Sequence, residues 1–436
     1  MSRYFSSAEF ALRRKRLFDA LPDGAIAIIA ASPQVLRNGD DNTFAYRASS
    51  DILYLTGFTE PNCVLLFDKT GKADRFCMFV QAQDHAAEIW HGKRAGTAGA
   101  VSSYGADTAY AITSLGAVLT RLCARATQIY FKPSGNAALE KTINKAAKKT
   151  GARYRNPLAI IAEHRLVKSE AELALMRHSG QVGSDGHIAA MAHCQPGQIE
   201  LALKGMLDFV FATNGGTTAY DSIVAAGTNG LCLHYPAGLT ELKDGDLVLI
   251  DAGCEIEGYA SDISRTFPVS GRFTSAQKEI YEVVLAAQMA AIAAVKPGVT
   301  LRQLDKIAEG VLVNGLNSLG FPMGTGGLRA SDVMPHGLGH WLGLDVHDVG
   351  NYNTRSRSKD GKKRARDTSR PLVAGMVFTV EPGVYLSTDD QRIPEPYRGI
   401  CVRIEDNIEV TASGALVQTS AAKTVAEIEQ VMSRKA

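Results

Sequence analysis

The stretch from Asp251 to Asp262 is the feature that most constrains the fold of this chain. It follows Leu247–Ile250, an apolar run typical of a buried strand, and it precedes Ile263–Phe267, in which apolar and polar residues alternate. Between these runs, Glu255–Gly258 supplies turn residues. Two strand-like runs joined by such a turn predict a β-hairpin.

The register of this hairpin decides where the two aspartates lie. If the loop centres on Ile256 and Glu257, Asp251 lies directly opposite Asp262. Opposed side chains have Cβ atoms roughly 4.5–5.5 Å apart, and two like charges at that distance need a cation or a shared proton. A pair of divalent metal ions would meet this need, because one carboxylate can bridge two ions. The alternative is a pair of solvated carboxylates at strand ends, which two aspartates alone would favour.

Length and composition indicate a two-domain globular protein. The chain has 436 residues, of which 45% are hydrophobic and 21% charged, so a sizeable core is expected. A net charge of +2 gives no reason to expect nucleic acid or a membrane as partner. The N-terminus lacks a signal-peptide core, and the longest nearly apolar run, Val283–Val295, is too short to span a bilayer. Seven scattered cysteines without a C-x-x-C pair predict a reducing, cytoplasmic setting.

The pattern of apolar residues changes near residue 168. Strand-like and helix-like segments alternate before this point, which predicts a small α/β domain over 1–168. Ser169 and Glu172 then form a capping box, which predicts a long helix from residue 170. The strands expected in the first domain are Ala25–Ala31, Cys63–Phe67, Phe76–Val80 and Ile129–Phe131, and the helices are Phe10–Leu21, Ala109–Ala124 and Ala137–Lys149.

In residues 169–436 the strand-like segments are grouped together and flanked by helix-like segments, which predicts an α+β domain. The further helices expected there are Glu200–Ala212, Ser275–Val295, Leu301–Leu319 and Val425–Ser433. The expected strands are Ser222–Ala226, Leu247–Thr266 and Val377–Glu381, with a last hairpin over Cys401–Thr411.

One segment of this domain is strongly basic, with eight lysines and arginines between Arg355 and Arg370. Such a cluster can bind nucleic acid. Asp360 and Asp367 lie within it, however, and no aromatic residues are interleaved. This composition favours a solvated loop.

Three histidines, His336, His340 and His347, lie within twelve glycine-rich residues. Neutral imidazoles ligate divalent metals and can also donate hydrogen bonds to an oxyanion. A structural His-Gly loop is the alternative for this cluster taken alone. The density of histidines therefore predicts a candidate site without fixing its chemistry.

Two glutamates complete the candidate set. Glu381 ends an alternating strand before Pro382, and Glu405 shares a strand face with Arg403. Each glutamate alone is more typical of a solvent-facing strand residue. Four carboxylates together carry about −4, which two divalent ions would neutralise; Mn²⁺ suits this oxygen-rich set, with Co²⁺, Zn²⁺ and Fe²⁺ as rivals. The candidate metal ligands are Asp251, Asp262, His340, Glu381 and Glu405.

These residues belong to motifs that follow one another in a familiar order. They are Asp251-Ala-Gly with Ser261-Asp262, His336-Gly-Leu-Gly-His340, His347-Asp348, Val380-Glu381-Pro382-Gly383 and Arg403-Ile404-Glu405-Asp406, joined in the first domain by Arg37-Asn-Gly-Asp40, Tyr54-Leu-Thr-Gly57-Phe58 and Glu88-Ile-Trp90. In these motifs the chain resembles the pita-bread metallopeptidases, most closely the bacterial Xaa-Pro aminopeptidase (aminopeptidase P) family. The resemblance implies an α/β N-terminal domain followed by an α+β pita-bread catalytic domain.

The resemblance also implies a role for each metal ligand. Asp262 and Glu405 would bridge two metal ions, Asp251 would chelate one ion, and His340 and Glu381 would complete the other. A hydroxide shared by the metals would attack the scissile carbonyl. Glu381 would also carry a proton to the leaving imino nitrogen.

Further residues match the family's active-site pattern. His234 and His347 resemble donors of hydrogen bonds to substrate carbonyls and to the tetrahedral intermediate, and His336 and Arg403 resemble additional catalytic partners. The resemblance assigns substrate binding to Asp40, Trp90, Tyr220, His234 and His347.

Among these, Tyr220 would lie near the metals and Asp40 would help to place the free amine of the substrate. Trp90 resembles a residue that reaches the site of a neighbouring subunit, which implies a homo-oligomer, either a dimer or a tetramer. The basic segment is longer than this family usually carries, which affects expectations for substrate preference and assembly.

The resulting prediction is a dinuclear metallo-exopeptidase that releases the N-terminal residue from peptides with proline in second position. Prolidase, which cleaves Xaa-Pro dipeptides, is the alternative within the same class. A nucleic-acid or protein-binding module that uses the basic segment is the alternative from a different class.

Overall fold

The computed structural model describes residues 3–148, 151–354 and 369–433. The chain divides into two compact units, the first ending at Arg165 and the second beginning at Leu166, close to the boundary that the sequence predicts. Within the described ranges, none of the helices is long and apolar enough to cross a bilayer. Most of the basic segment, residues 355–368, lies outside the described residues, so its assignment to a solvated loop stays a prediction.

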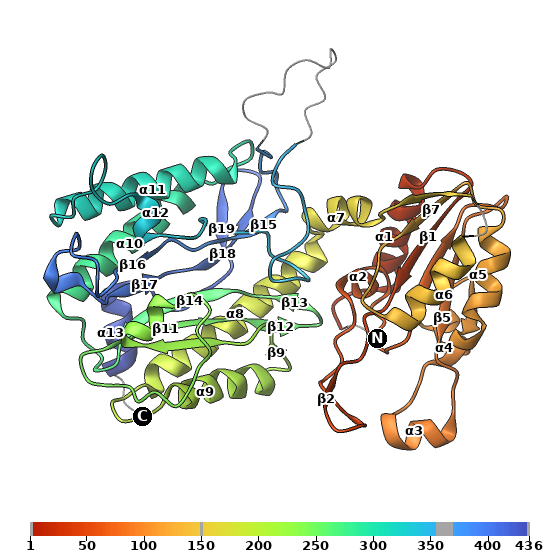
Figure 1. The fold of residues 1–436 in the computed structure, drawn as a ribbon, viewed down its shortest axis with the longest axis horizontal. Coiled ribbons are helices and arrows are strands. Elements are labelled where there is room, and N and C mark those ends of the chain that lie inside the picture. The colour runs from red at the N-terminus through yellow and green to blue at the C-terminus, as the bar shows by residue number, and fades with distance from the viewer. Residues whose placement is uncertain (1–2, 149–150, 355–368, 434–436) are drawn as a thin grey trace, which may run out of the picture. The chain divides into compact units, whose positions relative to one another are not determined.

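A six-stranded mixed sheet forms the centre of the first unit, in the order β6-β5-β4-β1-β7-β8 (Figure 1). β4 is antiparallel to β1 and to β5, and the remaining neighbours run parallel. β1 and β4 are buried along their whole length, as expected for strands covered on both faces. The strands are β1 (Ala25–Ala30), β4 (Val64–Asp68), β5 (Arg75–Val80), β6 (Thr108–Ala111), β7 (Gln128–Phe131) and β8 (Arg153–Arg155).

Helices cover both faces of this sheet. Ile26 and Ile28 of β1 belong to one apolar cluster with residues of α5 and α6. Phe67 of β4 points to the opposite face and meets Phe18 of α1, with ring centroids 5.1 Å apart. The predicted helix over 109–124 is wrong in its first part, because those residues pair with β5 as strand β6. The helices are α1 (Ser7–Ala20), α2 (Ser50–Thr56), α3 (His85–His91), α4 (Gly96–Ser102), α5 (Leu115–Cys123), α6 (Ala137–Ala147) and α7 (Leu158–Leu166).

Two helix pairs flank the strands of the second unit, with α8 and α9 on one side and α10 and α11 on the other (Figure 1). The predicted capping box is confirmed, since Ser169 and Glu172 exchange hydrogen bonds at the start of α8. Glycine lets α8 lie close to the strands: a Cβ on Gly183 would come within 2.7 Å of the Ser261 hydroxyl. The helices are α8 (Glu170–His193), α9 (Glu200–Thr213), α10 (Ser275–Ala293), α11 (Leu301–Ser318), α12 (Ala330–Val333) and α13 (Val425–Ser433).

The strands of the second unit form several small sheets. The hairpin expected over Cys401–Thr411 is wrong, because β17 pairs with β16 whereas β18 pairs with β15 and β19. Ile404 and Glu405 donate backbone hydrogen bonds to Pro382 and Ser264, so the chain passes from one sheet to the next without reversing. The strands are β9 (Thr217–Thr218), β10 (Ile223–Ala226), β11 (Leu247–Ala252), β12 (Cys254–Ile256), β13 (Tyr259–Ala260), β14 (Ile263–Pro268), β15 (Val377–Val380), β16 (Gly383–Tyr385), β17 (Cys401–Arg403), β18 (Asp406–Val410) and β19 (Ala415–Val417).

The predicted hairpin around the two aspartates is present, but its register differs from the prediction. The two loop residues are Glu257 and Gly258, both with positive φ (47° and 88°), as tight two-residue hairpin loops require. Asp251 consequently lies opposite Ser264, and not opposite Asp262. Because the shift equals two residues, the side-chain period of a strand leaves both aspartates on the predicted face.

Candidate metal centre

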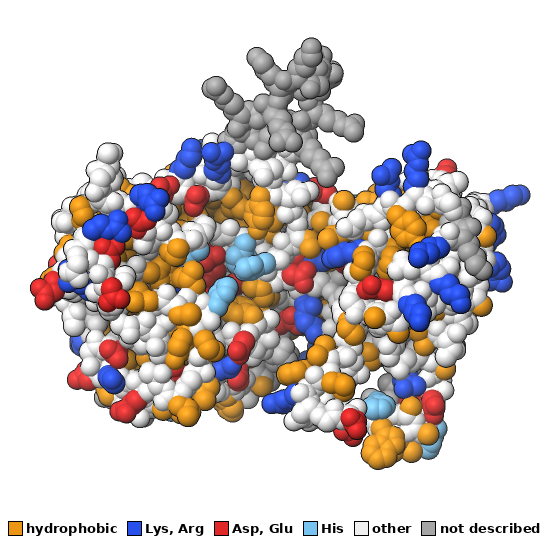
Figure 2. Space-filling model, viewed as in Figure 1, with side chains coloured by type: hydrophobic (Ala, Val, Ile, Leu, Met, Phe, Trp, Pro, Cys, Tyr) orange, Lys and Arg blue, Asp and Glu red, His pale blue; other side chains and the backbone are white. Residues whose placement is uncertain are grey.

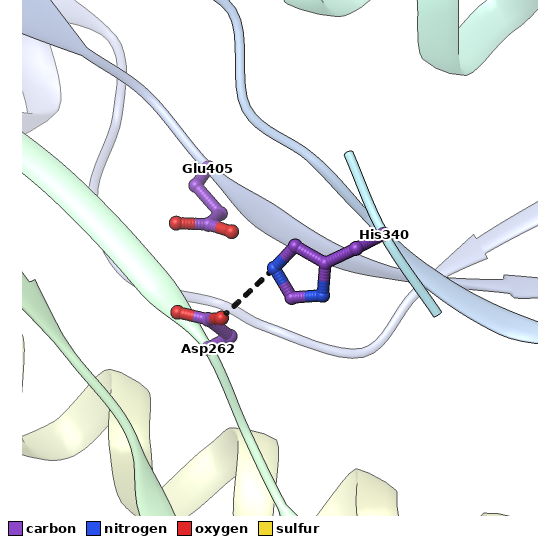
Figure 3. A group of neighbouring side chains, drawn as sticks. All are labelled: Asp262, His340 and Glu405. Carbon is purple, nitrogen blue, oxygen red and sulfur yellow. Dashed lines mark ion pairs between the residues drawn. The ribbon is translucent and has the colours of Figure 1, made fainter. Parts of the chain in front are cut away.

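Asp262, His340 and Glu405 come together from three separate segments of the second unit (Figure 3). Asp262 follows β13, His340 lies in the loop before β15, and Glu405 lies between β17 and β18. One ligand atom from each residue lies within 4.8 Å of the other two. Both carboxylates are buried, and His340 Nε2 is 3.4 Å from Asp262 Oδ2.

The glycine-rich loop is held beside β15, and this pairing brings His340 to Glu381. Backbone N–H groups of Thr379 and Glu381 donate to the carbonyls of His340 and Leu338, at 2.9 and 2.8 Å. A Cβ on Gly339 would overlap the carbonyl oxygen of Thr379, so only glycine permits this approach. Glu381 Oε1 consequently lies 3.7 Å from His340 Nε2.

Tyr220 connects the two aspartates, because its hydroxyl makes hydrogen bonds with Oδ1 of both Asp251 and Asp262. The other oxygen of Asp251 accepts a hydrogen bond from Arg403 Nη2 at 2.7 Å. The structure therefore brings all five predicted metal ligands into one cluster, although the hairpin register was predicted wrongly.

The cluster concentrates negative charge where water is scarce. Burial and neighbouring carboxylates raise the pKa of Glu405 well above its usual range and that of Asp262 above its usual range. Burial likewise raises the pKa of Glu381 to about 7, although the charge of His340 opposes the shift. Glu405 Oε1 is buried without a hydrogen-bond partner in the described structure. Carboxylates arranged in this way fit divalent cations, which would supply the missing positive charge.

Arg403 orders a layer of side chains around the carboxylates. Its guanidinium contacts Asp251, and it also donates to the hydroxyls of Ser264 at 2.9 Å and Tyr385 at 2.7 Å. Ser264 in turn donates to Glu405 Oε2 at 2.8 Å. Neither Ser264 nor Tyr385 was predicted from the sequence. Ser264 lies two residues after Asp262, so the side-chain period of a strand would have placed Ser264 and Asp262 on the same face.

Three more of the predicted site residues are histidines near the carboxylates, and Figure 2 shows a group of histidine side chains on one face of the second unit. His347 lies beside His340, with ring centroids 4.0 Å apart. His336 Nε2 is 2.9 Å from the Tyr385 hydroxyl, and burial lowers the pKa of His336 to about 4. Burial lowers the pKa of His347, and the charges of His340 and His234 lower it further. Neutral imidazoles of this kind can donate hydrogen bonds at neutral pH.

Asp40 and Trp90 belong to the first unit. Asp40 is exposed at the tip of the ribbon formed by β2 (Leu36–Asn38) and β3 (Asn42–Thr43). Trp90 lies on α3 and is 83% exposed. Neither residue has a described contact with the metal ligands, so their assignment to substrate binding stays a prediction.

The metal-free protein is expected to lose stability as pH rises from about 6.5 to 9. Burial alone would lower the pKa of His340, but its hydrogen bond to Asp262 and the charges of Asp262 and Glu381 raise it to about 9. The folded state then keeps a proton that the unfolded chain releases above pH 6.5, so this stabilisation is complete below 6.5 and is lost as pH passes 9. The loss should reach on the order of 3 kcal/mol.

Chemical unfolding of chelated protein at several pH values would measure this slope. Bound metal requires a neutral imidazole, so the metal-loaded protein serves as the control and should not show the decrease. The lowered pKa of His336 moves its titration below pH 6.5, outside this window. A flat profile for the chelated protein between pH 6.5 and 9 would contradict the proton shared between His340 and Asp262.

Two family models match the chain. The model of metallopeptidase family M24 matches residues 174–412, and the model of the aminopeptidase P N-terminal domain matches residues 10–130. The matched ranges fall within the second and first units, respectively. They agree with the predicted α/β domain followed by a pita-bread domain.

Known proteins resemble the chain over almost its whole length. Xaa-Pro aminopeptidase of Escherichia coli is 38% identical, covering 98% of this chain and 98% of its own. The structure of proline aminopeptidase P II from Yersinia pestis gives a TM-score of 0.91 at 36% identity, covering 98% of this chain and 100% of that one. Zn-substituted E. coli aminopeptidase P in complex with product gives 0.92 at 37% identity, covering 99% of both chains. The predicted resemblance is thereby confirmed: the chain belongs to metallopeptidase family M24.

Proposed function

We propose that this chain is a dinuclear metal-dependent Xaa-Pro aminopeptidase, which releases the N-terminal residue from peptides with proline in second position. The observation that carries the proposal is the group of Asp262, His340 and Glu405, in which the buried Glu405 Oε1 lacks a hydrogen-bond partner in the described structure. Glu381 adjoins this group at His340, and Asp251 is connected to Asp262 through Tyr220. The E. coli relative named Xaa-Pro aminopeptidase matches over the full length, including the first unit. This coverage favours an aminopeptidase P over members of the family that have only the second domain.

Two metal ions, with Mn²⁺ as the proposed ion, would be held by the five clustered residues. Asp262 and Glu405 would serve as ligands to both ions, Asp251 to one of them, and His340 and Glu381 to the other, as the resemblance implies. When bound, the ions would neutralise the carboxylates and lower the pKa of a water molecule enough for it to attack the scissile carbonyl. Co²⁺, Zn²⁺ and Fe²⁺ also suit this ligand set, and the E. coli enzyme has been obtained in a Zn-substituted form.

The protein's own side chains would handle protons and orientation. Glu381 would take a proton from the attacking water and return it to the imino nitrogen of the leaving proline. His234 and His347 would donate hydrogen bonds to substrate carbonyls and to the developing oxyanion. Arg403 and His336 meet at the Tyr385 hydroxyl, so together they would hold that side of the site in place.

Replacing His347 by alanine is expected to leave metal binding intact but to lower kcat about 100-fold or more, as loss of an oxyanion donor does. His347 is exposed beside the ligand His340 and is absent from the cluster of ligand atoms. Metal content and the kinetics of Xaa-Pro-Yaa cleavage should be measured together. His193→Ala, at the exposed end of α8, is the control. An unchanged kcat would remove His347 from the catalytic set.

Hydrolysis of matched Xaa-Pro-Yaa, Xaa-Ala-Yaa and Xaa-Pro peptides tests the proposal directly. Enzyme stripped with a chelator should release Xaa from the proline tripeptide once Mn²⁺ is added back, with little release from the alanine peptide. Cleavage of the dipeptide alone would assign the chain to prolidase instead. No cleavage of any peptide by protein with bound metal would overturn the proposed substrate.

We also propose a homo-oligomer located in the cytoplasm. Ile89 and Trp90 on α3 are 71% and 83% exposed, and large exposed apolar side chains often mark an interface between subunits. Six of the seven cysteines are buried free thiols, which suits a reducing compartment. Light scattering should give a mass of at least two chains, and Trp90→Glu should reduce it.

A further inference from the structure

Glu200 is a buried carboxylate that no assigned function uses. It is the first residue of α9, its side chain is fully buried, and both of its oxygens accept hydrogen bonds. Oε1 accepts from the backbone N–H of Ala226 and from Nδ2 of Asn229, each at 2.9 Å. Oε2 accepts from the backbone N–H of Gly238 at 3.0 Å. One carboxylate thus binds both Ala226 and Gly238, which are twelve residues apart in the chain.

The segment between these two points, residues 227–237, carries His234. Its outgoing end is held again by backbone bonds, because the N–H groups of Glu200 and Leu201 donate to the carbonyls of Thr240 and Gly238 at 3.1 and 3.2 Å. Asn229 Nδ2 also donates to the hydroxyl of Tyr235 at 2.9 Å. Tyr235 is the immediate neighbour of His234, so the contacts of Glu200 reach the histidine within one residue.

The same segment packs onto the wall of the metal centre. Leu231, Leu233 and Tyr235 lie against an apolar cluster that includes Tyr385. Tyr385 is the residue whose hydroxyl contacts both His336 and Arg403. The segment therefore extends from the start of α9, where Glu200 holds it, to the side chains that surround the carboxylates.

We propose that Glu200 is a positioning residue, whose carboxylate closes the 227–237 segment and thereby fixes His234 for hydrogen bonding to the substrate. The inference rests on the proposed function, which assigns that donor role to His234. His234 itself is exposed, so its position depends on the backbone that carries it. A catalytic donor must be held within roughly 0.5 Å of its productive position, and ordering a free segment costs backbone conformational entropy at every residue.

A carboxylate suits this task better than any neutral side chain. All three of its partners are donors, and only an ionised carboxylate offers acceptors at both oxygens without carrying a donor of its own. The first turn of a helix also favours a negative charge. Glu200→Gln keeps the volume but places an amide N–H₂ against at least one N–H donor, so one end of the segment is released.

A double-mutant cycle with His234 tests the assignment. Glu200→Gln is expected to lower kcat/KM for Xaa-Pro-Yaa about tenfold in the wild-type background and less than about twofold in the His234→Ala background. Equal losses in both backgrounds, or no loss in the first, would overturn the proposal. Leu207→Ala is the matched control, because Leu207 is buried on the same helix and packs toward Gly186 of α8. It should weaken the fold without lowering kcat/KM.

Hydrogen exchange gives a readout that does not depend on peptide cleavage. Glu200→Gln should speed exchange of the backbone amides of Ala226 and Gly238, and unchanged exchange would overturn the closure itself. Faster exchange in a protein that cleaves none of the peptides would support the closure while overturning the proposed function. Asn229→Ala removes one of the three bonds to the carboxylate together with the bond to the Tyr235 hydroxyl. It should therefore show a loss in the same cycle even where Glu200→Gln fails to fold, and no loss would overturn the proposal.

Discussion

Replacing Glu405 by glutamine is expected to lower kcat/KM by roughly a thousandfold or more and to prevent binding of two metal ions. Glu405 Oε2 accepts a hydrogen bond from Ser264, whereas Oε1 is buried and free of hydrogen bonds in the described structure, which leaves it available to a metal. Glutamine keeps the size and the Ser264 contact but loses the charge. Asp262→Asn should act in the same way, because Asp262 lies in the same group of ligand atoms. Metal content and peptide hydrolysis should be measured on the same samples.

The stability of the metal-free protein gives a second readout. Here Glu405→Gln should be favourable, whereas it is unfavourable for activity. Burial and nearby carboxylates raise the pKa of Glu405, so its ionised form destabilises the folded state when no cation is present. Metal-free Glu405→Gln should therefore unfold at a higher temperature than metal-free wild type, and it should gain less from added Mn²⁺. Glu279→Gln, which removes an exposed carboxylate on α10, should change neither quantity. Full activity with two bound metals in Glu405→Gln would overturn the ligand assignment.

Local signals in the sequence were sufficient to predict most helices. The capping box at Ser169 and the apolar pattern that follows it locate the start of α8, and the last helix has the predicted bounds, Val425–Ser433. Both signals depend only on residues within a few positions of each other, which is the range over which capping and helical periodicity act. Such elements need no tertiary contact to be recognised.

The hairpin register could not be obtained in this way. A loop of Glu257 and Gly258 places a glutamate at positive φ, a conformation for which the sequence offers no signal, because asparagine or glycine usually occupies that position. The two aspartates nevertheless reach the same site, since a two-residue shift preserves the strand face. The candidate site was therefore easier to predict than the pairing that builds it.

The order of the last strands depends on contacts that are distant in the chain. Cys401–Arg403 and Asp406–Val410 alternate as two hairpin strands would, but Ile404 and Glu405 make backbone bonds to Pro382 and Ser264. Only the partner strands decide whether such a run reverses or continues. The partners that separate β17 from β18 are β16 and β15, and both lie more than 15 residues away in the chain. Long-range pairing likewise explains why Tyr385, opposite Cys401 on β16, was missed as a contact of Arg403.

Replacing Arg403 by methionine is expected to destabilise the metal-free protein by about 3–5 kcal/mol and to lower kcat/KM about 10- to 100-fold. The guanidinium of Arg403 is buried, and among the described residues it is the cation that contacts Asp251. Its loss therefore leaves that carboxylate without a described positive partner. Added Mn²⁺ should restore part of the lost stability, because the metal brings positive charge to the same carboxylate. Thermal unfolding with chelator and with Mn²⁺ measures this difference. Arg177→Met breaks a more exposed pair, with Glu409, and its effect should not depend on metal. Equal destabilisation of Arg403→Met with and without Mn²⁺ would show that Asp251 does not belong to the metal centre.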